Sequence, residues 1–159
     1  MAMPAHAYRI APAAPAAAIA AYVRAVLYSS RGVPYRVVDA EPYSCAAEMA
    51  ARVRAERELL IWSGGSAGLA WTPAVNHAAR AVHDWLDHLD ALRGSLVVPF
   101  DLRGEAAACR RACARWPALA PLLRAEILGQ AACYALDGAF PPQRAAWMEE
   151  ETCDPCRGY

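Results

Sequence analysis

Hydrophobic positions along the chain recur mostly at intervals of three and four residues, the spacing of one helix face. Thr72 followed by Pro73 is a typical helix start, because a threonine hydroxyl caps the helix and proline suits its first turn. Gly94 marks the expected end of this helix, near Leu92. The pattern predicts helices over about 13–29, 43–58, 73–92, 101–116 and 118–136, with a short final helix over 141–151.

Short apolar segments interrupt this helical pattern. YRVVDA at 35–40 and ELLIW at 58–62 are bounded by turn-forming residues and predict strands. SLVVPF at 95–100 is a short connector or strand. We therefore predict a mainly α fold, a single-domain helical bundle with a minor β element.

The two ends of the chain differ from its middle. We expect residues 1–12 to form a loose N-terminal arm, residues 13–150 a single helical domain, and residues 151–159 a Cys-containing C-terminal tail. A chain of 159 residues is long enough to bury a core of its own.

Composition narrows the classes of partner and compartment. The 16 basic residues, all arginine, balance 16 acidic ones, so we expect neither nucleic acid nor an anionic membrane surface as a partner. No apolar run reaches the roughly 18 residues that cross a bilayer. Six cysteines without a convincing export signal predict reduced thiols and a cytoplasmic protein, although an even number leaves disulfides open.

Three of the four histidines lie on the helix that begins at Thr72. At about 100° per residue, His77, Asp84 and His88 fall within about 40° of one another at the margin of the apolar face. His83 falls nearly opposite the core, where exposure is expected. Asp84 and His88 are therefore the natural ligand pair for a metal ion, with His77 two turns earlier. The alternative for all three is a solvated helix edge.

Two acidic residues lie on apolar helix faces. Glu126 belongs to a helix that is apolar almost all round, with Gln130 one turn later on the same face. Glu105 shares its face with apolar residues near the start of the preceding helix, where an acid also favours the helix dipole. A buried carboxylate needs a cation, a proton or an arginine partner, because leaving it bare costs several kcal/mol.

These residues together predict a site for a divalent metal such as Zn, Fe or Mn, built from inward-facing helical side chains. Asp84, His88 and Glu126 are the expected ligands, completed by His77, His83 or Glu105. A carboxylate left free, with Glu105 the candidate, would act as general base on a metal-activated water. Gln130 would not contact the metal itself but would orient a ligand or the water through a hydrogen bond. This set favours a hydrolase-like protein acting on a small-molecule substrate.

Two other interpretations remain open. The same polar residues could form a buried hydrogen-bond network in a non-enzymatic structural or binding protein, phage-encoded or virion-associated. The cysteines of CRRAC (Cys109 and Cys113) and CDPC (Cys153 and Cys156) could instead hold a structural zinc ion.

The stretches VNHAARAVHDWLDH, RGE and AEILGQ resemble a group of uncharacterised helical proteins from phage and bacterial genomes. Those proteins carry an N-x-A-x-R-A-x-H-D stretch, then Gly-Glu, then Glu-x-x-Gly-Gln. The resemblance spans about 75–130 and implies no activity. It does imply one set of candidate residues: His83, Asp84, His88, Glu105, Glu126 and Gln130. The HD dipeptide is also similar to that of the HD phosphohydrolases, but their first histidine lies on a separate helix.

Overall fold

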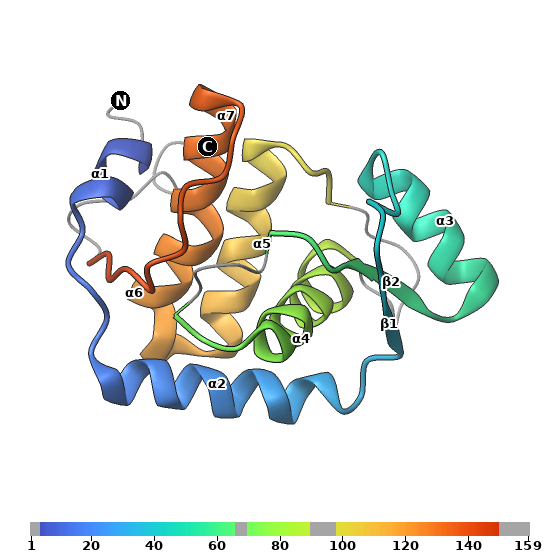
Figure 1. Cartoon of the computed structure of the whole chain (residues 1–159), viewed down its shortest axis with the longest axis horizontal. Helices are drawn as coiled ribbons and strands as arrows, with labels where there is room; N and C mark the ends of the chain where they lie inside the picture. Colours follow the sequence, from blue (N-terminus) through green and yellow to red (C-terminus); the bar gives the residue numbers. More distant parts are fainter. Residues whose placement is uncertain (1–3, 66–69, 90–97, 150–159) are drawn as a thin grey trace.

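The computed structural model of the protein describes residues 4–65, 70–89 and 98–149. These residues are mainly helical, with one small sheet, which confirms the predicted fold class (Figure 1). The longer helices are α2 (Ala16–Ser30), α3 (Ala46–Glu56), α4 (Pro73–His83) and α5 (Leu102–Arg115). Shorter ones are α1 (Pro4–Ile10), η2 (Pro117–Leu119), α6 (Ala120–Leu123) and α7 (Gln130–Asp137), and the π-helical turns are η1 (Asp84–His88) and η3 (Arg124–Gly129).

Both predicted strands form. β1 (Tyr35–Val38) pairs in parallel with β2 (Leu59–Trp62), and α3 connects them. The two strands differ in burial, since Leu59, Leu60 and Ile61 of β2 are almost inaccessible while the middle of β1 is exposed. Helix α4 packs against β2 on one side and against α2 on the other, so the sheet fixes the position of α4.

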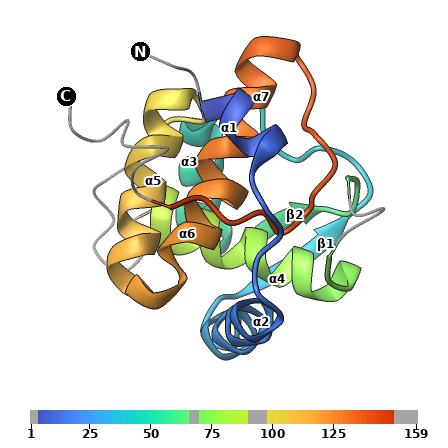
Figure 2. The same ribbon diagram turned by 90° about the vertical axis from the view of Figure 1, so that its left-hand side faces the viewer.

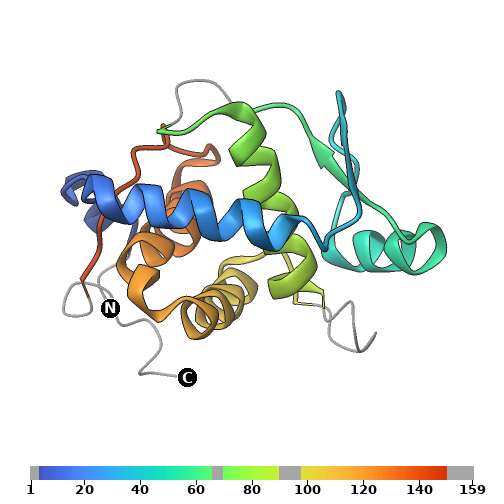
Figure 3. The same ribbon diagram turned by 90° about the horizontal axis from the view of Figure 1, so that it is seen from below.

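The helices gather at one end of the molecule, and the sheet with α3 lies at the other (Figure 1). Helix α2 crosses beneath α4 and the α6 segment, as the view from below shows (Figure 3). Helix α1 lies beside α7 (Figure 2). No helix among the described residues is long and apolar enough to cross a membrane.

Helix α4 begins as predicted but ends earlier. The Thr72 hydroxyl accepts a bond from the Val75 amide, with Pro73 in the first turn. The helical path stops at His88, not near Leu92, because Leu89 is extended and the Val98 amide donates to the His88 carbonyl at 3.0 Å. Most of the predicted SLVVPF segment lies outside the described residues.

The N-terminal segment differs from the loose arm that we expected over 1–12. Residues from Pro4 to Ile10 form α1, and the side chain of Tyr8 is 1% exposed. Its hydroxyl donates to the Pro142 carbonyl at 3.1 Å, so the two ends of the described chain are packed together. Apolar burial by Tyr8 overrides the alanine-rich, proline-containing sequence that suggested a flexible arm.

The short final helix predicted over 141–151 is wrong for the described part, 141–149, which has an irregular path. Its backbone bonds go to distant partners: Ala145 accepts from the Ala14 amide at 2.7 Å and Trp147 donates to Pro12 at 2.8 Å. The segment begins with two consecutive prolines, and Ala145 has φ +50°. These contacts replace the i to i−4 bonds that a helix requires.

Candidate metal centre

The site begins with the π-turn η1, which follows α4 without a break. The Leu89 amide donates to the Asp84 carbonyl at 2.9 Å, five residues back, in place of the four-residue spacing of an α-helix. Residues five apart therefore share a face here, whereas in an α-helix they would lie about 140° apart. This brings the rings of His83 and His88 together, with centroids 4.6 Å apart.

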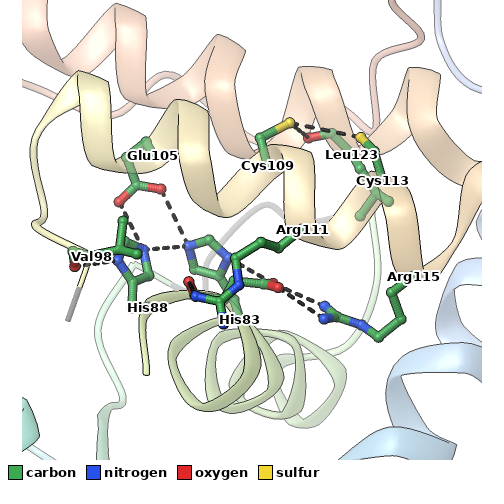
Figure 4. Close-up of polar contacts among 10 residues, drawn as sticks. His83, His88, Val98, Glu105, Cys109, Arg111, Cys113, Arg115 and Leu123 are labelled. Atoms are coloured by element: carbon green, nitrogen blue, oxygen red, sulfur yellow. Dashed lines mark hydrogen bonds and ion pairs between the residues drawn. The ribbon is translucent and has the colours of Figure 1, made fainter. Parts of the chain in front are cut away.

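Helix α5 supplies the third member of the group. Asp101 caps α5 as expected, since its carboxylate accepts a bond from the Gly104 amide at 2.7 Å. Glu105 follows in the first turn and points at both histidines (Figure 4). Its Oε2 lies 3.2 Å from His83 Nε2 and its Oε1 lies 3.2 Å from His88 Nε2.

The two histidine Nε2 atoms are themselves 2.9 Å apart. Two nitrogen ligands about 2.0–2.1 Å from a tetrahedral zinc ion lie about 3.3 Å from each other. The separations among His83, His88 and Glu105 are close to this value without any rearrangement of the helices. The group therefore has the spacing of a 2-His-1-carboxylate ligand set.

A backbone carbonyl orients His88. The ring is fully buried, its Nδ1 lies 3.0 Å from the Val98 carbonyl oxygen, and Phe100 packs edge-on against it. A carbonyl only accepts, so Nδ1 carries the proton and the Nε2 of the neutral ring presents a lone pair to the site. Metal-binding histidines usually show this pattern, with a hydrogen bond behind the ring.

Asp84 lies beside these three residues. Ligand atoms of His83, Asp84 and His88 all lie within 4.8 Å of one another, and this group could hold a metal ion. Burial raises the pKa of Asp84, while the nearby histidines oppose that rise. Asp84 is thus a carboxyl group at the margin of the site whose surroundings favour its protonated form.

The charges in the site are strongly coupled. Burial alone would raise the pKa of Glu105, but contacts with His83 and His88 outweigh it and hold that pKa at about 2. Burial likewise disfavours protonation of His83, yet the carboxylates of Asp87 and Glu105 raise its pKa well above the usual value. The converging lone pairs require positive charge among them, which a proton or a metal cation supplies.

The structure brings together four of the predicted site residues, His83, Asp84, His88 and Glu105. His77 lies apart from them, because its Nε2 faces the Ser63 carbonyl oxygen at 3.5 Å near the end of β2. The predicted exposure of His83 is corrected: α5 covers that side of the helix and leaves the His83 side chain 22% exposed.

Glu126 and Gln130 lie elsewhere, so the prediction that they belong with the histidines is corrected. Gln130 donates to Glu126 Oε2 at 2.7 Å, and the Ala146 amide donates to Glu126 Oε1 at 3.2 Å. The Glu126 carboxylate therefore holds the irregular segment before Met148 in place. The partners of this half-buried carboxylate among the described residues are backbone and side-chain amides.

The sequence pattern did not identify the residues that support the ligands. Asp87 falls on the same side of the helical wheel as His83, where exposure was expected, but it is 1% exposed and paired with Arg115. Its i,i+4 spacing from His83 was a signal that could have been used. The Val98 carbonyl and Arg115 had no such signal, since both depend on how the chain packs after Leu89.

The described cysteines are free thiols and do not gather four ligands. Cys109 and Cys113 lie on adjacent turns of α5 with Sγ atoms 3.9 Å apart, and each contacts a backbone carbonyl of the helix opposite (Figure 4). They pack in the core as small apolar residues. Cys153 and Cys156 lie outside the described residues.

No protein-family model matches this chain, and comparison with curated proteins and with solved structures finds no significant match. The site is therefore interpreted from its own geometry and chemistry.

Proposed function

We propose that the protein binds one divalent transition-metal ion through His83, His88 and Glu105 and uses it for hydrolysis. The convergence of two Nε2 atoms and a carboxylate within 2.9–3.2 Å carries the proposal. Imidazole and carboxylate ligands suit Zn, Fe and Mn, and three protein ligands leave a position open for water. Such an ion, when bound, lowers the pKa of a coordinated water to about 7.

Asp84 is the proposed general base. It adjoins His83 in sequence, and its carboxyl lies within 4.8 Å of both histidines while taking no part in the Glu105 contacts. Burial raises the pKa of Asp84, which brings a carboxyl group closer to the range in which it exchanges protons efficiently. In this scheme Glu105, the base candidate from sequence, is a ligand because both of its oxygens face histidine nitrogens.

Metal analysis of the purified protein tests the centre. Inductively coupled plasma mass spectrometry should find about one equivalent of metal in the wild type, as expected for one three-ligand site. His88→Ala should abolish this binding, since it removes a buried ligand. His77→Ala is the matched control, because it removes a histidine of the same helix outside the group and should keep the metal. Equal metal content in all three proteins would refute the proposal.

Hydrolysis is tested separately with chromogenic carboxylic and phosphoric esters. Asp84→Asn should keep the metal and lose roughly 10²–10⁴-fold in rate, the usual contribution of a general base. If the metal-loaded wild type hydrolyses neither carboxylic nor phosphoric esters, the hydrolase assignment is refuted and only the metal-binding assignment stands.

One observation favours the non-enzymatic alternative. Arg115, Asp87, His83 and Glu105 form a continuous chain of charged contacts that is paired without any ion. If that network only fixes the packing of two helices, the thermal transition of the purified protein will be unaffected by chelators and by added Zn²⁺.

A further inference from the structure

Asp87 is a buried carboxylate that is not among the proposed ligands. Arg115 holds it with two parallel bonds, from its two terminal nitrogens to Oδ1 and Oδ2, both at 2.9 Å. Arg111 donates to the Asp87 backbone carbonyl at 2.9 Å. The charge is therefore compensated and the orientation of the carboxylate is fixed, since a bidentate pair allows little rotation.

The residues that fix Asp87 come from the helix that also carries Glu105. Arg111 and Arg115 lie on consecutive turns of α5, and the guanidinium of Arg115 packs over the Trp116 ring at 4.6 Å. Ala108 and Ala112 of the same helix are almost completely buried, and α5 packs against η1. One rigid helix thus sets the position of a proposed ligand and of the Asp87 carboxylate.

Asp87 lies directly behind His83. Its Oδ2 is 3.5 Å from His83 Nδ1, on the opposite side of the ring from Nε2, which faces the site. The contact is longer than a good hydrogen bond. An ionised carboxylate can only accept, so Asp87 is placed to accept the Nδ1 proton that His83 keeps when its Nε2 binds a cation. In the metal-free site Nε2 also faces an acceptor, Glu105 Oε2 at 3.2 Å, and it lies 2.9 Å from His88 Nε2. The Val98 carbonyl takes the corresponding position behind His88.

We propose that Asp87, held by Arg115, is a positioning residue that fixes the His83 ring and accepts its Nδ1 proton when Nε2 binds the metal. The inference rests on the proposed metal centre. Carboxylate, histidine and metal in this order form a recurring arrangement in which the outer carboxylate fixes the ring and increases its basicity.

Asp87→Asn separates this role from a simple ion pair. Arg115 only donates, so it will take the amide oxygen and leave the amide NH₂ group facing His83 Nδ1. An NH₂ group facing Nδ1 opposes the Nδ1-protonated form that His83 must adopt to bind a metal through Nε2. Helix packing and side-chain volume are nearly unchanged by this substitution.

The experiment measures Zn²⁺ affinity by competition with a chromophoric chelator and, in the Zn²⁺-loaded protein, the His83 Nδ1–H signal by ¹H–¹⁵N NMR. Asp87→Asn should raise the Kd for Zn²⁺ by about 10–100-fold, as is usual when such an outer carboxylate is altered. In the Zn²⁺-loaded variant the Nδ1 proton should resonate upfield of its wild-type position, because it has lost its carboxylate acceptor. Glu56→Gln, which alters an exposed i,i+4 carboxylate paired with Arg52, is the control and should change neither quantity.

If the wild type binds Zn²⁺ and Asp87→Asn has equal affinity and an unchanged Nδ1–H signal, this inference is overturned and the metal centre stays intact. Wild-type protein that binds no Zn²⁺ would overturn both. If Asp87→Asn does not fold by circular dichroism, Arg115→Lys replaces it. Lysine keeps the charge but not the two-pronged geometry, so zinc affinity should still fall severalfold, and an unchanged affinity would overturn the inference.

Discussion

At the scale of single residues, two glutamates on similar apolar faces have different partners. Glu105 faces two imidazoles, and its pKa is held at about 2 in spite of burial. Glu126 accepts bonds from amide donors, and burial raises its pKa while those donors oppose the rise. The pKa of the same side chain is thus lowered in one place and raised in the other.

Glu126 gives a pH prediction. Its folded pKa lies above the ordinary value of 4.5, so its contribution to stability is complete below pH 4.5 and is lost as the pH rises through the raised pKa. Glu126→Gln lacks this titration. The melting temperature of the variant relative to the wild type should therefore rise as the pH increases from 4.5, in metal-free protein measured by calorimetry. A constant difference across that range would contradict the assigned shift.

At the scale of elements, the site depends on two departures from regular helix. The π-turn η1 places His83 and His88 on one face, and the close passage of the chain before α5 supplies the Val98 carbonyl. Gly104 permits that passage, because a Cβ at this position would lie 1.9 Å from the Pro99 carbonyl oxygen. The close approach of the chain that orients His88 therefore requires glycine at position 104.

Gly104→Ala should displace the segment around Pro99, and with it the Val98 carbonyl that orients His88. We expect a loss of about 1–3 kcal/mol in unfolding free energy, the usual cost of overpacking, together with weaker Zn²⁺ binding. Urea denaturation and zinc titration measure the two effects. Gly32→Ala is the control, since a Cβ there meets only an atom 3.9 Å away. A stable variant with normal zinc affinity would show that this passage does not position His88.

At the scale of the whole molecule, three clusters of buried residues surround the site. One joins α3, β2 and α4, a second joins α2, α4, α5 and α6, and a third joins α1, α5, η3 and α7. The candidate ligands come from α4 with η1 and from α5, helices that share the second cluster, so a bound ion would add a further link between them. A ligand that binds only the folded state stabilises the whole fold.

Zn²⁺ at about 100 times its Kd should stabilise the wild type by about 2.7 kcal/mol, which corresponds to roughly 5–10 °C in melting temperature for a chain of this size. Excess chelator should reverse the increase. His77→Ala should respond like the wild type and His88→Ala should not respond. Differential scanning fluorimetry of the three proteins provides the comparison, and equal shifts in all of them would locate zinc binding outside the histidine group.

The sequence by itself determined most local features: the helical segments between residues 13 and 138, both strands, the caps at Thr72 and Asp101, and the acids on apolar faces. Propensity, period and capping act within a few residues and can be read directly. Only the tertiary structure decided which polar residues meet. A helical wheel drawn at 100° per residue places Asp84 and His88 on one face and His83 on another. The wheel assumes a regular α-helix and therefore cannot represent the π-turn over Asp84–His88. Packing of α5 against η1 places Glu105 beside His83, and the Val98 carbonyl orients His88. Glu126 instead accepts a bond from the Ala146 amide, away from the histidines. These partners are far apart in sequence, and their meeting depends on how the helices pack.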